Sequence, residues 1–238
     1  MNMFILSEDA PDPIPSKADR TRERILQTAL TLFKNGGYES TTMREIARES
    51  DSSLGLAYRY FSSKEQLVLA FYQMLAGQFV TKISQLPKGT VARRFAVAME
   101  TKLALIEPYR ELIGVLLSAA LNPASRVSVL GKDSAGIRAQ MQEAFDRIVR
   151  DSDDAPSAAS SAALAKLLYV AHLGLLFFRV NDPSEAGRAT RELLAWIEKT
   201  LSCLPLVSEL PLFSEGLLRL AASLDTVFGG HADEHAAE

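Results

Sequence analysis

Residues suited to contacts with nucleic acid are concentrated between positions 41 and 64. Threonine and tyrosine hydroxyls and lysine or arginine cations bind phosphate oxygens, and apolar side chains contact thymine methyl groups. The segment holds both kinds of residue, so we expect it to contact DNA. The residues that we assign to this contact are Thr41, Thr42, Arg44, Ser53, Leu54, Gly55, Leu56, Tyr58, Arg59, Tyr60 and Lys64.

The spacing within this segment predicts two short helices joined by a tight turn, over 42–49 and 53–58. Thr42 and Glu45 fit a capping box, in which each side chain binds a free backbone amide at the helix start. Ser53 can cap the second helix in the same way. Two such helices form a helix-turn-helix, whose second helix enters the major groove of DNA.

The second of these helices is poor in hydrogen-bonding side chains. Leu54 and Leu56 would read bases through thymine methyl groups and DNA shape, and Gly55 would let the backbone approach closely. Tyr58 has a competing interpretation as a core aromatic, and Arg44 as a solvated side chain. An exposed leucine pair on a short helix, however, indicates a contact surface.

The charge of the chain is unevenly distributed. The net charge is −3, yet residues 17–64 hold nine Lys and Arg against six Asp and Glu, which leaves the rest at −6. A basic segment on an acidic body favours a surface that faces a polyanion. An ordinary solvated helix face explains a local charge of +3 about as well.

The motifs of common enzymes are absent from the sequence. It contains no Gly-x-Ser-x-Gly, no phosphate-binding loop, no Gly-x-Gly-x-x-Gly and no His-Glu-x-x-His. We therefore expect no enzyme, no cofactor and no metal. His172 has leucine four residues before and after it instead of a second ligand, and Cys203 is the single cysteine, read as a buried bystander unless it senses oxidants.

Helical periodicity extends through the whole chain, and no segment alternates like a strand. Pro, Gly and Asp clusters separate the apolar runs, so the fold class is all-α. After the two short helices the expected helices are a long one from 63 to about 79, then 90–106, 108–121, 134–151, 157–180, 184–204 and 210–228. The apolar stretch 164–180 includes Lys166 and His172 and reads as too polar for a membrane span. With no signal peptide visible, we expect a cytoplasmic protein that does not bind membranes.

The N-terminal quarter resembles the TetR/AcrR family of bacterial transcriptional repressors. The resemblance covers roughly residues 18–78 and rests on many coinciding spacings. The residues that carry it are Ile25-Leu26, Ala29, Leu32-Phe33, Gly37-Tyr38, Thr41-Thr42, Ile46-Ala47, Ser53, Gly55, Tyr58-Arg59-Tyr60-Phe61, Ser63-Lys64-Glu65 and Leu67. The turn departs from the family's usual Ala-Gly-Val-Ser, because it reads Ser50-Asp51-Ser52-Ser53. Asp51 suits a left-handed turn, whereas Ser52 replaces an apolar packing residue.

The resemblance implies a three-helix DNA-binding domain joined by a long helix to a larger helical domain that binds an effector and dimerises. Accordingly we divide the chain into a disordered arm (1–17), a helix-turn-helix domain (18–78), an effector and dimerisation domain (79–228) and a flexible tail (229–238). The implied partners are double-stranded operator DNA, a second copy of the chain and a small molecule. The dimer interface is assigned to parts of 157–180 and 184–204, with Trp196 as an anchor.

A small-molecule pocket is expected in the larger domain, with a mostly apolar lining that favours a largely apolar effector. The alternative is that these residues only fill the hydrophobic core. The residues assigned to the pocket are Phe95, Met99, Leu103, Tyr109, Leu116, Met141, Phe145, Tyr169, His172 and Phe177, with Arg138 as a further polar candidate.

Two hypotheses about function follow. The first is a dimeric, ligand-responsive repressor that binds a palindromic operator. The second is a helical protein–protein interaction module that has lost DNA binding, which the polar Ser52 and the leucine-rich second helix would favour. Salt-dependent binding to duplex DNA distinguishes them, because phosphate contacts make affinity fall steeply with salt.

Overall fold

The computed structural model describes residues 16–207 and 210–228, and the predicted tail 229–238 and most of the predicted arm lie outside them. All regular elements in the described part are helices, as the sequence predicted. Its α-helices are α1 (Lys17–Gly36), α2 (Met43–Glu49), α3 (Leu54–Tyr60), α4 (Lys64–Ile83), α5 (Val91–Ile106), α6 (Arg110–Leu121), α7 (Ala135–Arg150), α8 (Ala158–Asn181), α9 (Arg188–Leu201), α10 (Leu204–Val207) and α11 (Pro211–Phe228).

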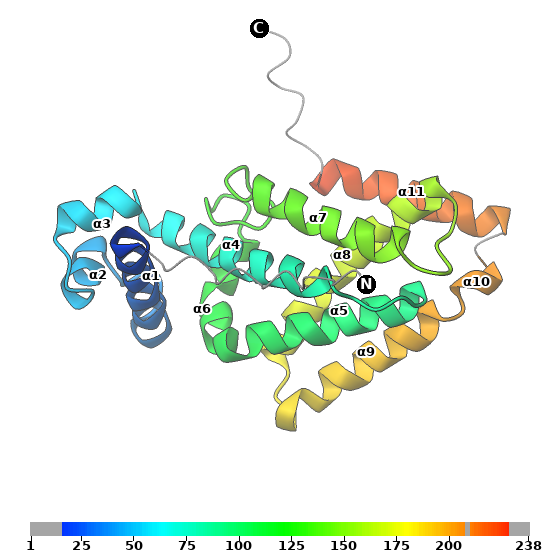
Figure 1. Cartoon of the computed structure of the whole chain (residues 1–238), viewed down its shortest axis with the longest axis horizontal. Coiled ribbons are helices and arrows are strands. Elements are labelled where there is room, and N and C mark those ends of the chain that lie inside the picture. The colour runs from blue at the N-terminus through cyan, green and yellow to red at the C-terminus, as the bar shows by residue number, and fades with distance from the viewer. Residues whose placement is uncertain (1–15, 208–209, 229–238) are drawn as a thin grey trace, which may run out of the picture.

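Helices α1, α2 and α3 form a small unit at one end of the molecule, which we call the head (Figure 1). Helix α4 runs from the head into the rest of the protein, which we call the body (α5–α11). In the body, α5 and α9 pack together on one side, and α8 packs against α7 and α11 on the other. The molecule is therefore elongated, with the helix-turn-helix exposed at its tip.

Local sequence signals set the ends of the head helices. The first helix begins at Lys17, the last residue of the predicted disordered arm, because Ser16 and Asp19 form a capping box across its first turn. Gly37 ends it with a φ of 91°, a conformation that costs glycine little. Ser53 caps α3 by accepting a hydrogen bond from the Leu56 amide at 3.1 Å.

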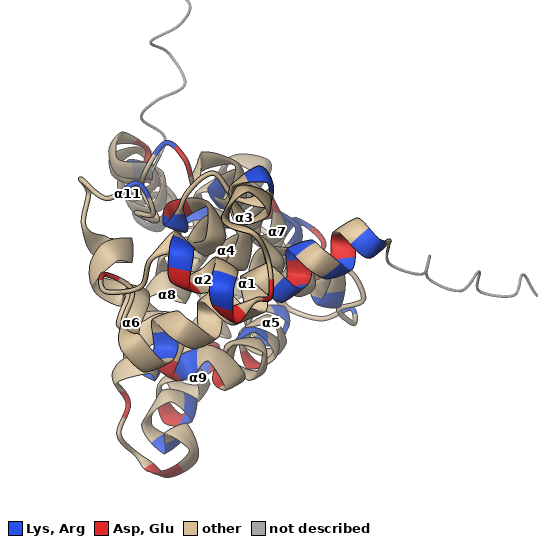
Figure 2. Ribbon diagram, turned by 90° about the vertical axis from the view of Figure 1, so that its left-hand side faces the viewer, with Lys and Arg blue, Asp and Glu red and all other residues tan. Residues whose placement is uncertain are grey.

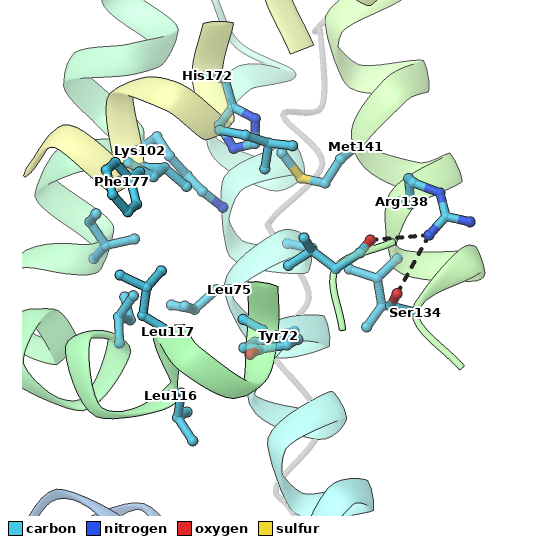
Figure 3. Close-up of a pocket in the computed structure, with 18 of the residues that line it drawn as sticks. Tyr72, Leu75, Lys102, Leu116, Leu117, Ser134, Arg138, Met141, His172 and Phe177 are labelled. Atoms are coloured by element: carbon cyan, nitrogen blue, oxygen red, sulfur yellow. Dashed lines mark hydrogen bonds between the residues drawn. The ribbon is translucent and has the colours of Figure 1, made fainter. Parts of the chain in front are cut away.

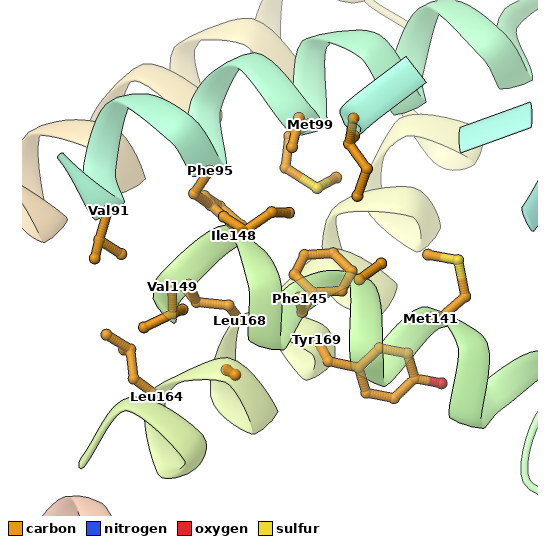
Figure 4. Packing of buried hydrophobic residues seen from close by; sticks show 14 of the residues in the cluster. Val91, Phe95, Met99, Met141, Phe145, Ile148, Val149, Leu164, Leu168 and Tyr169 are labelled. Carbon is orange, nitrogen blue, oxygen red and sulfur yellow. The ribbon is translucent and has the colours of Figure 1, made fainter. Parts of the chain in front are cut away.

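The head and the body have separate apolar cores, and Leu103, Ile137 and Leu176 pack against both of them. The head core is built around Ile25, Phe33, Ile46 and Leu67, and it extends into α6 through Leu116. The body core holds the large buried side chains of α4, α5, α7 and α8. Figure 4 shows part of this second core, in which Phe95, Met99, Phe145, Leu168 and Tyr169 interlock.

Helix α8 is the central element of the body. Among the described helices it is the one with the length and the mean hydropathy (1.7) of a membrane span, so its composition is more apolar than the sequence reading allowed. Its packing against α7 and α11 is that of a core helix, and it buries His172 and Arg179 along its length. Arg179 makes two contacts of 2.6 and 2.7 Å with the Glu107 carboxylate.

Candidate nucleic-acid interface and ligand cavity

The turn between α2 and α3 holds the two helices of the head in a fixed relation. Asp51 adopts a φ of 48°, the left-handed conformation expected of it. The Ser52 hydroxyl donates to the Ser50 carbonyl at 3.3 Å, and the Ser52 amide donates to Ala47 at 2.9 Å. Because its polar groups are satisfied, Ser52 is accommodated in place of an apolar residue. Arg24 of α1 donates to the Asp51 carbonyl at 3.4 Å.

Helix α3 presents one face to solvent at the tip of the molecule. Leu54 is 36% exposed and Tyr58 is 48% exposed, whereas Ala57 is fully buried against the head core. A Cβ atom placed on Gly55 would meet no atom within 4 Å, so the backbone at this position is open to an approaching surface. Exposed apolar and aromatic side chains on so short a helix indicate a contact surface.

Exposed cations flank this face. Arg44 of α2 and Arg59 of α3 are exposed and make no hydrogen bond or ion pair with the described residues. Arg48, by contrast, contacts the Glu49 carboxylate at 2.8 Å. Figure 2 looks onto this end of the molecule and shows Lys and Arg on α1 and α2 alternating with acidic residues. The free cations are available to phosphate groups.

Three residues assigned to DNA from the sequence, Thr41, Tyr60 and Lys64, have intramolecular roles instead. Thr41 is buried, and its hydroxyl donates to the Gly37 carbonyl at 2.8 Å. The Lys64 ammonium donates to the carbonyls of Tyr38 and Glu39 at 2.8 and 3.2 Å, and it lies over the Tyr38 ring.

Tyr60 is half-buried and packs against the head core. Thr42, Ser53 and Leu56 stay at the surface or near it, with Thr42 capping α2 through the Glu45 amide at 3.2 Å. The candidate interface is therefore narrower than the assigned set. It comprises Thr42, Arg44, Ser53, Leu54, Gly55, Leu56, Tyr58 and Arg59.

A cavity of about 230 Å³ lies in the body between α4, α5, α6, α7 and α8. Its walls are almost wholly apolar, and Figure 3 shows its lining side chains. Of the residues assigned to a pocket, the structure places five in this lining together with Arg138. They are Leu116, Met141, Tyr169, His172 and Phe177.

The other five assigned residues do not line the cavity. Phe95, Met99 and Phe145 are completely buried in the body core, so these three residues fill the core and do not form a pocket. Leu103 packs between the two cores, and Tyr109 packs edge-on against the Phe71 ring with 5.2 Å between ring centroids. Apolar periodicity locates the inward face of a helix but does not separate core from cavity.

The cavity contains polar groups that sequence reasoning missed. Lys102 of α5 lines it with a side chain only 5% exposed, and burial lowers the pKa of this lysine to about 8. The Tyr72 hydroxyl of α4 also lines it and has no hydrogen-bond partner among the described residues. One signal was available: Lys102 follows Phe95 and Met99 and precedes Ile106 at helical spacing, which puts a cation on a buried face.

His172 lies at the same cavity as a neutral ring. Its Nδ1 is 3.0 Å from the Tyr169 carbonyl oxygen, and it stacks near Phe145 with 5.0 Å between ring centroids. Burial, and secondarily the charge of Lys102, lower its pKa to about 3. Cys203, expected to be buried or half-buried, is exposed.

Large apolar side chains are exposed on α8 and α9. Phe177 and Phe178 are 49% and 40% exposed near the end of α8, and Trp196 of α9 is 65% exposed. Aromatic residues on the surface of a protein of this size are costly unless another surface covers them.

Comparison with known proteins supports the reading of the head. Residues 25–71 match the family model described as bacterial regulatory proteins, tetR family. The HTH-type transcriptional repressor KstR of Mycolicibacterium smegmatis is 40% identical over 70 residues, which are 29% of this chain and 33% of that protein. KstR of Rhodococcus jostii is 42% identical over 60 residues, 25% of this chain and 28% of the other.

The matched part is thus about a third of the length of these curated relatives, which are transcriptional regulators and not enzymes. The fold is similar over a longer range. A TetR transcriptional regulator from Nitrosomonas europaea superposes with a TM-score of 0.58 at 17% identity, covering 76% of this chain and 97% of the other. Residues 25–71 therefore match the helix-turn-helix of TetR-family transcriptional regulators, and the described part of the chain has the fold of these regulators.

Proposed function

We propose that the protein is a ligand-responsive repressor that binds a palindromic operator as a dimer in the cytoplasm. The main observation behind the proposal is the exposed face of α3, where Leu54, Gly55 and Tyr58 are accessible to solvent at the tip of the molecule. In a helix-turn-helix these positions meet base edges and the sugar–phosphate backbone. Leu54 suits a thymine methyl group, and the Tyr58 hydroxyl suits a phosphate oxygen.

Dimerisation would supply the two-fold symmetry that a palindrome requires. Phe177 and Phe178 of α8 and Trp196 of α9 are exposed apolar groups on neighbouring elements of the body. Their exposure supports this assignment, because a second copy packed on this surface would remove them from water. A two-fold dimer places its two α3 helices at half-sites whose centres are about 34 Å, one turn of DNA, or a multiple of it apart.

The position of the cavity supports a response to ligands. Phe71 and Leu75 of α4 line it and also belong to the head core, as do Ile106 and Leu116. A ligand that packs against these side chains would favour one position of the head over another. Release from DNA then requires that the ligand bind the non-binding arrangement more tightly, and a coupling of about 1–3 kcal/mol changes operator affinity about 5- to 150-fold.

Selection of DNA from a random duplex library, followed by fluorescence anisotropy at several salt concentrations, tests the proposal. We expect a selected palindrome and a steep fall of affinity with salt. Arg59→Ala should reduce the slope of log affinity against log salt by about one. The control Lys82→Ala removes an exposed cation at the far end of α4 and should leave the slope unchanged. Absence of salt-dependent binding would favour the protein-interaction module instead.

A further inference from the structure

Lys102 is a buried cation without an acidic partner. Its side chain is 5% exposed, and it makes no ion pair and no hydrogen bond within the described part of the chain. Its one polar contact is with the face of the Phe79 ring, 5.0 Å from the ammonium nitrogen to the ring centroid. Burying an ammonium group costs free energy unless another group compensates its charge, so this lysine calls for a partner that the protein itself does not supply.

The surroundings of Lys102 are positive overall. Among the residues that line the cavity there is no aspartate or glutamate. Arg138 is a second cation, but its guanidinium donates to the carbonyls of Val129 and Gly131 at 3.1 and 3.2 Å. Figure 3 shows Arg138 turned toward that loop, whereas the Lys102 nitrogen points into the space beside His172. A cavity with this charge and no acid attracts an anion.

We propose that the cavity binds a compact amphipathic carboxylate, with its carboxylate on the Lys102 ammonium and its apolar body against the surrounding leucine and methionine side chains. This deepens the proposed function, on which it rests, because it assigns a chemical class to the effector of that same site. The Tyr72 hydroxyl, which is buried without a partner in the part of the chain that the structure describes, is a second donor lining the cavity. A hydrogen bond from it would remove the cost of an unsatisfied buried group.

The dimensions and walls of the cavity define the rest of the ligand. Its volume of about 230 Å³ lies below the 300–1,000 Å³ typical of sites for drug-sized molecules, which favours a compact ligand. Leu75, Leu117 and Met141 provide apolar walls, and the exposed Leu121 at its edge marks a side that is open to solvent. A single free ammonium matches one negative charge, so a carboxylate fits better than a phosphate dianion, which would bury a second charge.

Three ligands with one tail and different head groups test this inference: octanoate, 1-octanol and octylammonium. Binding to the full chain without DNA is measured by titration calorimetry and by thermal shift. We expect octanoate to bind most tightly and octylammonium most weakly, because the ammonium head repels Lys102. A second pair, 4-phenylbutyrate and 4-phenylbutanol, repeats the comparison with a different compact tail.

Variants of the two donors separate the charge from the shape of the cavity. Lys102→Met keeps an apolar side chain of similar length, and it should weaken octanoate binding about 30-fold, as expected when one partner of a buried charge pair is removed. The same change should leave 1-octanol binding unchanged or improved. Tyr72→Phe should weaken octanoate roughly two- to tenfold by removing one hydrogen bond, and the exposed Lys82→Met should change nothing.

The carboxylate site is refuted if both alcohols bind as tightly as their acids, if no compound of either pair binds, or if Lys102→Met leaves the preference for acids intact. These outcomes are separable from failure of the proposed function. If octanoate binds through Lys102 but does not alter affinity for the selected DNA, the site stands and the ligand response fails. If 1-octanol alone binds and releases DNA, the ligand response stands and the carboxylate site fails.

Discussion

Replacing Lys102 by methionine should stabilise the ligand-free protein. Burial lowers the pKa of this lysine from 10.5 to about 8, which corresponds to a penalty of about 3 kcal/mol at neutral pH because each pKa unit is worth about 1.4 kcal/mol. The contact with the Phe79 ring returns about 1 kcal/mol of this. The expected net gain for Lys102→Met is therefore about 2 kcal/mol, or about 4–8 °C in melting temperature.

The gain should depend on pH in a defined direction. In the unfolded chain the lysine keeps its ordinary pKa of 10.5, and in the folded protein it has lost its proton above about pH 8. Between these two values the unfolded state binds more protons, so the stability of the wild type rises with pH relative to the variant. The difference between the two proteins should be constant below about pH 8 and should close toward pH 10.5.

Urea unfolding followed by circular dichroism, at equal protein concentration and at several pH values, measures this difference. Other groups also titrate in alkaline solution, but they are common to both proteins and cancel in the comparison. Lys88→Met, at an exposed position, should give no difference at any pH. A Lys102→Met protein that is no more stable than the wild type at pH 7, or a gain that does not shrink with rising pH, would show that the ammonium is better compensated than its surroundings indicate.

Three further predictions concern the backbone, the assembly and the head. Gly187→Ala should destabilise the protein by about 1–3 kcal/mol, because φ is +69° there and the new Cβ would lie 2.9 Å from Arg179. The control Gly77→Ala adds a Cβ in open space on α4 and should stabilise the protein by about 0.5–1 kcal/mol. Trp196→Glu should convert the proposed dimer to a monomer in analytical ultracentrifugation, and an unchanged mass would exclude this surface. Thr41→Val should lower stability by about 1 kcal/mol while the folded variant keeps full DNA affinity; weaker DNA binding would restore Thr41 to the interface.

The head was predictable from its sequence because short-range signals determine it. Ser53 caps α3, and Asp51 takes the left-handed turn, through atoms only a few residues apart. Residue type alone could not tell which polar side chains remain free. The Lys64 ammonium donates to the carbonyls of residues 38 and 39, more than twenty positions earlier in the chain. Whether this cation is free to bind DNA therefore depends on tertiary packing.

The cavity was harder to predict for the same reason. Five helices enclose it, and whether an inward side chain fills the core or lines the void depends on how closely the opposite helix approaches. Phe145 and Met141 are one helical turn apart on α7, yet Phe145 contributes nothing to the lining and Met141 does. The most informative residue, Lys102, has the helical spacing of an inward-facing residue. Its charge does not suit that position, because a lone cation on a buried helix face needs a compensating charge.

The connection between the cavity and the head follows from α6. Leu116 lines the cavity and packs in the head core, and Lys34 of α1 contacts the Glu111 carboxylate of α6 at 2.7 Å. That ion pair is exposed and contributes little energy, so the apolar contacts must transmit most of any coupling. Protein interiors are densely packed, so a ligand larger than the empty space would have to displace the helices around the cavity. In the proposed ligand response, such a displacement would act on α6 and α4 together, the two elements that hold the head against the body.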